Sequence, residues 1–182
     1  MKRLFRLLSC LALLLFVGSA QAFPPSKMTT FKRIATEAAL EAGVEPPVIE
    51  LDLTPSKEDV GQALVYPKVT ADGTVAWVIR IDATFLSDAS EARMYFIPAY
   101  YACHKKLGQI EPTSNTPWSD EDTQRATECT YRAVGMEIFV DFVFEESKVN
   151  ADLEPLKDLS KEELIEKFLV EYETPPDATA KK

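Results

Sequence analysis

The sequence predicts an α+β fold in which a short antiparallel sheet with a hairpin packs against several helices. Three short segments of β-type pattern follow one another between residues 48 and 82. Helical periodicity precedes them over 28–42 and dominates the chain after them, from 88 to 172. Strands that are segregated from long helices along the chain are typical of α+β proteins. Because no repeat or internal linker interrupts this order, we expect one domain over 23–172.

The first helix is predicted over 28–42. Phe31 and Ile34 begin an apolar stripe on one face of that helix, and Gly43 supplies a suitable end. The next segment, 48–53, alternates apolar and polar residues between prolines, which is the pattern of a short strand.

A β-hairpin is predicted to follow, with arms over 62–69 and 74–82. Asp72 and Gly73 form its turn, because a tight turn needs a residue that tolerates positive φ. Pro67 cannot donate a hydrogen bond to a neighbouring strand, so its arm is expected at an edge of the sheet.

A long helix is predicted over 88–107, with Asp88 as its capping residue and Gly108 at its end. Pro98 lies inside this helix and is expected to kink it or to destabilise it by about 3 kcal/mol. Residues 109–118 are rich in Pro, Ser, Thr and Asn, and this composition indicates a loop.

Two further helices complete the domain. Ser119 is expected to cap a helix over 119–146, whose apolar stretch "MEIFVDFVF" indicates burial. The last helix, 160–172, begins with a capping box formed by Ser160 and Glu163. Its apolar stripe comprises Leu164, Ile165, Phe168 and Leu169.

The two ends of the chain have compositions of their own. Three basic residues precede an apolar run over 7–17, and the small residues of "GSAQA" end at Ala22. This pattern predicts a signal peptide over 1–22, cleaved after Ala22, and hence an exported protein, periplasmic or secreted. The apolar run is shorter than the roughly 20 residues that span a bilayer, so an uncleaved anchor is disfavoured. Residues 173–182 are polar and are expected to be a disordered tail.

The charge of the chain excludes two classes of partner. The full sequence contains 20 Lys and Arg against 29 Asp and Glu, a formal net charge of −9. Removal of the signal peptide takes away three basic and no acidic residues, so that 17 remain against 29 and the charge becomes −12. Such a chain repels nucleic acid and anionic membrane surfaces, so neither is an expected partner of the mature protein. The composition does not indicate the oligomeric state.

Two cysteines, Cys103 and Cys129, remain after signal cleavage, because Cys10 lies within the signal peptide. Two cysteines in an exported chain usually pair, and closing this loop would stabilise the fold by roughly 3–4 kcal/mol. Two buried free thiols, or a zinc site that includes both thiolates, are the alternatives.

The only histidine, His104, lies in the stretch "AYYACHKKLG". Together with the order of elements, this stretch resembles the core of the gluzincin zinc metallopeptidases. In that family a strand precedes a helix that carries H-E-x-x-H, and a second helix supplies a ligand Glu. The ending "HKKLG" is similar to the family's His-x-x-Leu-Gly, and the resemblance covers roughly residues 28–140. It implies a zincin-like helix pair, here joined by the disulfide.

The resemblance also implies where the catalytic groups would lie, and this chain departs from the family there. The first His falls on Tyr100, the general base on Tyr101, and the ligand Glu on Gln124 in "QRATECTYRAVG", with Glu128 at the family's Asp. A phenol is a poor zinc ligand at neutral pH, Tyr101 has no carboxylate, and an amide carries no charge. Zinc enzymes usually need three protein ligands, and only His104 is left.

We therefore expect an exported, noncatalytic pseudo-peptidase with no metal and no cofactor. Its vestigial cleft would bind a peptide or a protein partner. The predicted cleft comprises Tyr100, Tyr101, His104, Gln124 and Glu128.

Two alternatives remain open at this point. A hydrolase with a rearranged metal site would combine His104 with Glu121, Asp122 or Glu128. An unrelated small, disulfide-stapled interaction protein would carry His104 as an ordinary residue near a helix C-terminus, where a cation is favourable.

Overall fold

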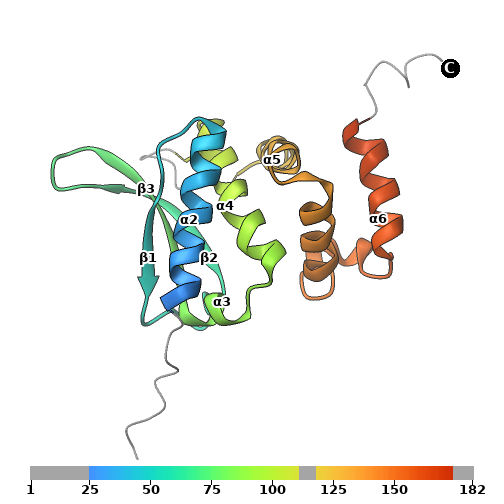
Figure 1. The fold of residues 1–182 in the computed structure, drawn as a ribbon, viewed down its shortest axis with the longest axis horizontal. Helices are drawn as coiled ribbons and strands as arrows, with labels where there is room; N and C mark the ends of the chain where they lie inside the picture. Colours follow the sequence, from blue (N-terminus) through green and yellow to red (C-terminus); the bar gives the residue numbers. More distant parts are fainter. Residues whose placement is uncertain (1–24, 111–117, 174–182) are drawn as a thin grey trace, which may run out of the picture.

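The computed structural model describes residues 25–110 and 118–173 and confirms the α+β class. In Figure 1, α2 and α4 lie beside the sheet, and α5 separates α4 from α6. In chain order the elements are α2 (Pro25–Ala42), β1 (Val48–Asp52), β2 (Ala63–Val69), β3 (Val75–Asp82), α3 (Ala83–Asp88), α4 (Glu91–Lys106), α5 (Asp120–Glu146), the 3₁₀-helix η1 (Ala151–Leu156), α6 (Lys161–Phe168) and the π-helix η2 (Leu169–Glu173).

The sheet is mixed, so the expected antiparallel sheet is wrong for one of its strand pairs. Its strand order is β1-β3-β2, with β3 parallel to β1 and antiparallel to β2. The hairpin is present as predicted, with Gly73 at φ 83° in its turn and Pro67 on the edge strand β2. The error arose because local pattern specifies the hairpin, whereas segment 53–62 carries the chain past β3 to the opposite edge.

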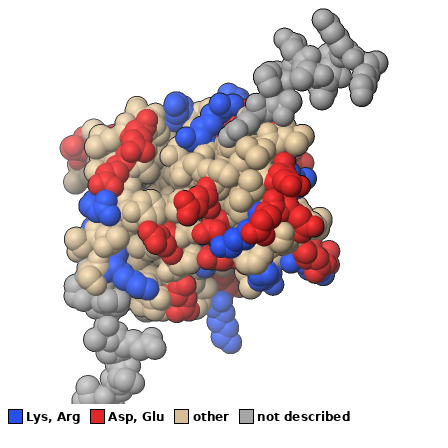
Figure 2. All heavy atoms as spheres, turned by 45° about the vertical axis from the view of Figure 1, so that its right-hand side comes forward, with Lys and Arg blue, Asp and Glu red and all other residues tan. Residues whose placement is uncertain are grey.

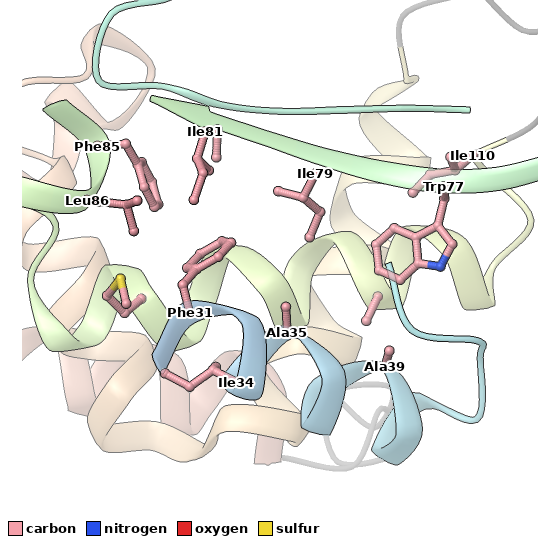
Figure 3. Close-up of a cluster of buried hydrophobic side chains, with 13 residues drawn as sticks. Phe31, Ile34, Ala35, Ala39, Trp77, Ile79, Ile81, Phe85, Leu86 and Ile110 are labelled. Carbon is pink, nitrogen blue, oxygen red and sulfur yellow. The ribbon is translucent and has the colours of Figure 1, made fainter. Parts of the chain in front are cut away.

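The sheet and the helices beside it enclose the first hydrophobic core. Alternate residues of β3, Trp77, Ile79 and Ile81, are at most 1% exposed, and Phe31 of α2 packs into the same core. Figure 3 shows the side chains of α2 and β3 pointing toward one another. The Trp77 Nε1–H donates to the Glu45 carbonyl at 2.7 Å, so the one polar atom of this indole is satisfied.

The predicted helix over 88–107 is α4, which begins at Glu91, and a separate short helix that was not predicted, α3, precedes it. The cap of α3 is Asp82, which accepts hydrogen bonds from the Phe85 and Gly61 backbone N–H groups at 2.6 and 2.9 Å. Ser90, rather than Asp88, caps α4. The three-residue spacing from Asp88 to Glu91 fits a capping box, which is why Asp88 was predicted as the cap. Ser90 is the N-cap instead, because it lies directly before the first helical residue.

Pro98 does not interrupt α4, whereas Gly108 ends it. Pro98 is buried inside α4, which continues through it to Lys106. Gly108 follows at φ 72°, and this left-handed residue ends the helix as predicted.

α5 begins as predicted and then bends at Gly135. Ser119 caps it in a capping box with Asp122. Gly135 has φ 80° and ψ 166°, a conformation open to glycine, and the pattern of the sequence did not reveal this bend. Beyond the bend, Phe139 and Val143 are buried, which confirms the expected burial of this stretch.

α6 covers the second half of α5. The Ser160–Glu163 capping box is confirmed. Leu164 and Phe168 are buried in a second core, whereas Leu169 is exposed, so the buried stripe is narrower than predicted. The helix passes into η2 at Leu169, and Tyr172 of η2 packs on the Tyr131 and Phe139 rings of α5 in the same core.

Several predictions concern the ends of the chain. The signal peptide over 1–22 lies outside the described residues, as does the tail over 173–182 apart from Glu173, the last residue of η2. Within 25–110 and 118–173, no helix combines the length and apolar character that crossing a membrane requires.

Candidate functional site

A disulfide between Cys103 and Cys129 joins α4 to α5, as predicted. The two Cα atoms are 5.9 Å apart, within the usual range for a disulfide. Both alternatives for these cysteines, free thiols and a thiolate zinc site, are therefore wrong. The bond fixes the crossing of the two helices that carry the predicted site residues.

His104 follows Cys103 and is fully buried, at 0% exposure. Its imidazole stacks on the Trp118 ring with 3.5 Å between ring centroids. Tyr100 lies one helical turn earlier on the same face and contacts the imidazole edge-on at 4.4 Å. These rings enclose the histidine, so no described surface of the molecule exposes it.

Burial keeps the imidazole of His104 neutral at neutral pH. Neither ring nitrogen has a hydrogen-bond partner among the described residues. Burial lowers the pKa of the imidazole to about 4, although the nearby Gln109 side chain and the charge of Asp122 act in the opposite direction. Gln109 itself is held by Asp122, whose Oδ1 accepts from Gln109 Nε2 at 2.9 Å.

The two tyrosines that replace catalytic residues have structural contacts. The Tyr101 hydroxyl donates to the Ala63 carbonyl of β2 at 2.6 Å, and burial raises the pKa of this phenol. Burial also raises the pKa of Tyr100, against the effect of a hydrogen bond with Thr123. Both phenols therefore remain protonated at neutral pH. The hydrogen bond of Tyr101 connects α4 to strand β2.

The five predicted cleft residues do not form one group, which corrects the sequence-based expectation. Gln124 and Glu128 are exposed on α5, and Glu128 pairs with Arg132 at 2.8 Å. Both lie on the opposite side of α5 from Ala126, which is fully buried. The error has a simple cause, because motif spacing places residues on a helix face but does not say which face meets α4.

Besides Tyr100, the residues around His104 are Trp118, Gln109 and Asp122, and the first two of these were not predicted. Trp118 and Gln109 lie at opposite ends of the predicted loop, and the Trp118 indole N–H donates to the Gln109 carbonyl at 3.0 Å. A hydrogen bond between the two ends of a loop leaves no periodic pattern in the sequence from which it could be predicted. Only Asp122 had a local signal, its place in the capping box of α5.

The carboxylates near His104 are not gathered as metal ligands within the described ranges. No group of three or more His, Cys, Asp or Glu side chains in 25–110 and 118–173 is arranged to hold a metal ion. Asp122 is engaged by Ser119 and Gln109, and Glu121 is exposed.

An open groove follows α2, on a different face of α4 from His104. Three adjoining cavities form it, with volumes of about 300, 340 and 460 Å³. The first two share Ile34, Glu91 and Tyr95, and the last two share Glu41 and Ala133. The groove runs beside most of α2, a length of roughly 24 Å at 1.5 Å per residue.

Three helices line this groove, which we call the α2–α5 groove. α2 forms one wall along its length, α4 contributes Tyr95 and Ala99, and α5 forms the other wall with Ala133, Val134 and Ile138. The disulfide borders the last cavity. Clefts of this size with mainly apolar walls and a few polar groups are typical of binding sites.

The chain matches no protein-family model, no curated protein and no solved structure. Because one fold can host many functions, function has to be inferred from the sites themselves. The described residues offer two: the enclosed His104 group and the open α2–α5 groove.

Proposed function

We propose that this chain is an exported, noncatalytic protein that binds a peptide segment of a partner protein in the α2–α5 groove. The observation that carries the proposal is the run of adjoining open cavities along three helices. A row of adjoining cavities along three helices suits an extended or helical segment better than a small, compact ligand.

The noncatalytic part of the proposal follows from the contacts of the motif residues. A general base must reach a substrate proton, but His104 is enclosed by aromatic rings and has a lowered pKa. Tyr101 occupies the place of the family's Glu, and its hydroxyl donates a hydrogen bond to the Ala63 carbonyl of the sheet. These groups stabilise the fold and are not free to act on a substrate.

A metallopeptidase-like ancestry is part of the same proposal. It is supported by the order strand, helix, crossing helix, and by the position of the disulfide between the two helices. The exposed position of Gln124 gives no support to the proposed register on α5. The ancestry therefore rests on α4 and on the order of elements.

The groove offers two kinds of interaction to a bound segment. Apolar side chains of the segment can be buried against Ile34, Tyr95 and Ala99, at about 25 cal/mol per Å² of apolar surface removed from water. Polar side chains along both walls can fix its direction. The small Ala99 and Ala133 leave room for a side chain from the partner.

Binding of a peptide in the groove is tested with a variant whose added side chain fills part of the groove. Peptides of twelve random residues are displayed on phage and selected against the oxidised chain, and the selected peptides are titrated by calorimetry. Ala133→Trp places a large ring at the junction of two cavities from an exposed position. We expect it to weaken binding at least ten-fold, because it occupies the space that a bound segment needs.

The matched control is Ala71→Trp, which adds the same side chain in the exposed hairpin turn. It should leave binding unchanged, and thermal melting should show that both variants are folded. Selected peptides that bind Ala133→Trp as tightly as the unsubstituted chain would overturn the proposed site.

The noncatalytic assignment has its own test in metal content. Chain purified without a chelator should contain well below one zinc ion per molecule, because a single imidazole does not hold zinc tightly. A ratio near one, lowered by His104→Phe, would instead support the hydrolase with a rearranged site.

Export is tested by determining the N-terminus of the protein recovered from cells. Cleavage after Ala22 would leave Phe23 as the first residue. A chain that retains residues 1–22 would contradict this part of the proposal.

A further inference from the structure

We infer that the α2–α5 groove selects a cationic segment, one in which apolar side chains are flanked by Lys or Arg. This inference rests on the proposed function and names the partner's chemistry. It follows from the acidic residues that line the central cavity and from the lack of an ion pair at two of them.

The central cavity is lined by three acidic residues, Glu37, Glu41 and Glu91, and by no Lys or Arg. Glu37 pairs with Arg33 at 2.6 Å. Glu41 and Glu91 are exposed, and the described residues provide no ion pair for either. Two carboxylates therefore line the central cavity without an ion pair, although Glu41 also lines the last cavity, which contains basic residues.

The basic residues that line the groove lie at its two ends. Lys27, in the first cavity, donates to the Ser87 carbonyl at 2.7 Å. Lys106 and Arg132 line the last cavity, and Arg132 is paired with Glu128. At the central cavity Arg33 neutralises Glu37, so Glu41 and Glu91 are left there as the carboxylates without an ion pair.

The spacing of the acidic residues suits a segment with more than one cation. Glu37 and Glu41 are one helical turn apart on α2, so their side chains lie roughly 6 Å from each other along the wall. Glu91, at the start of α4, lines the same cavity. The apolar surface between them, including Ile34 and Ala38, would be covered by the apolar side chains of the bound segment.

The charge of the whole chain acts in the same direction. Its formal net charge is −9, and Figure 2 shows Asp and Glu side chains in several groups over the face in view. A negative field attracts cationic segments and repels acidic ones, and salt weakens both effects. Charge would therefore determine which segment is selected and how fast it binds, while apolar burial supplies most of the affinity.

The test uses three labelled ten-residue peptides that differ only in charge: LKALKALKAL, LQALQALQAL and LEALEALEAL. Binding is followed by fluorescence anisotropy at low and at high salt. The variant E41Q/E91Q removes the two unpaired carboxylates without changing their size. Its control, E162Q/E166Q, makes the same change of net charge at exposed positions of α6.

The expected order of affinity is lysine, glutamine and then glutamate peptide, with salt reducing the difference. E41Q/E91Q should weaken the lysine peptide about five-fold, since each exposed ion pair contributes up to about 1 kcal/mol. The glutamine peptide should be unaffected, and E162Q/E166Q should leave all three affinities unchanged.

Two other results are informative in different ways. If all three peptides bind equally, and Ala133→Trp weakens each of them, the groove binds segments but the cationic inference is overturned. If no peptide binds, or binding is indifferent to Ala133→Trp, the proposed function fails and the inference fails with it. A lysine peptide weakened equally by both double variants would show attraction to the chain as a whole and would overturn selection by the groove.

Discussion

The two hydrophobic cores of this protein are built differently. The first lies between the sheet and helices α2 to α4, and strand residues such as Ile79 are fully buried there. The second is mainly aromatic and lies between α4, α5 and α6, with Phe139 and Phe168 rings 5.0 Å apart. The first core is closed by hydrogen-bonded strands and packed helices, whereas one short helix covers the outer side of the second.

Because the two cores are built differently, we expect local stability against unfolding to differ along the chain. α6 has two buried residues, Leu164 and Phe168, and one partly buried residue, Ile165, in contact with the second core. Elements with few buried apolar contacts open more readily than the core. The disulfide and the His104 group lie on α4 and α5, between these two regions. Substitutions in each region can therefore show whether the cores unfold together.

The largest effect is expected from Phe31→Ala in the first core. Phe31 is fully buried and contacts Phe85 edge-on, so its truncation leaves a cavity between α2 and the sheet. The free energy of unfolding should fall by about 3–5 kcal/mol, measured by urea denaturation with circular dichroism. Leu40→Ala, at a 63% exposed position of the same helix, is the control and should change it by less than about 0.5 kcal/mol. Equal effects of the two would contradict the described core.

Removing the disulfide should have the next largest effect. The bond joins residues 26 positions apart, and the chain-entropy model gives roughly 3–4 kcal/mol for a loop of this length. The double variant C103A/C129A should lose this amount in urea denaturation. Reductant should lower the stability of the unsubstituted chain in the same way and leave the variant unaffected. A variant as stable as the oxidised chain would show that α4 and α5 are held by packing alone.

Acidification should weaken the region around His104. Its pKa is about 4 in the folded protein and 6.5 in the unfolded chain, so between these values only the unfolded state binds the proton. This contribution to stability is complete above pH 6.5 and is lost as the pH falls toward 4, by about 3 kcal/mol.

The effect of this histidine is isolated by His104→Phe, which retains a ring for Trp118 to stack on and cannot titrate. Unfolding free energies of both proteins are measured from pH 7 to pH 4. The difference between them should change by about 3 kcal/mol over this range. Parallel pH profiles would show that the imidazole is less enclosed than the contacts indicate.

The smallest effect on the whole molecule is expected in the second core. Leu164→Ala should cost about 2–3 kcal/mol locally, because Leu164 is fully buried but belongs to a helix of few contacts. Hydrogen exchange should accelerate in α6 while the amides of β3 remain protected. Val170→Ala, at a 71% exposed position, should change neither. Loss of protection in β3 would mean that the two cores unfold as one unit.

Local patterns predicted much of the fold and only part of the candidate site. The Ser119 cap, the Ser160–Glu163 capping box, the glycine turn of the hairpin and the helix end at Gly108 were correct, because each depends on residues within a few positions. The position of β1 beside β3, the separate helix α3 and the bend at Gly135 depend on packing between distant segments. Of the predicted cleft, Tyr100, Tyr101 and His104 lie together because they share one helix, whereas Gln124 and Glu128 face solvent.

The sequence by itself determined the types of the main helices and strands, the edge position of β2 and the pairing of the two cysteines. These features depend on backbone conformation, missing donors and the number of available thiols, all of which can be read from residue identity. Only the tertiary structure decided which face of α5 meets α4, that Trp118 covers His104, and that α2, α4 and α5 leave a groove. A groove is the space that packed helices leave unfilled, and the relative positions of distant side chains decide that space.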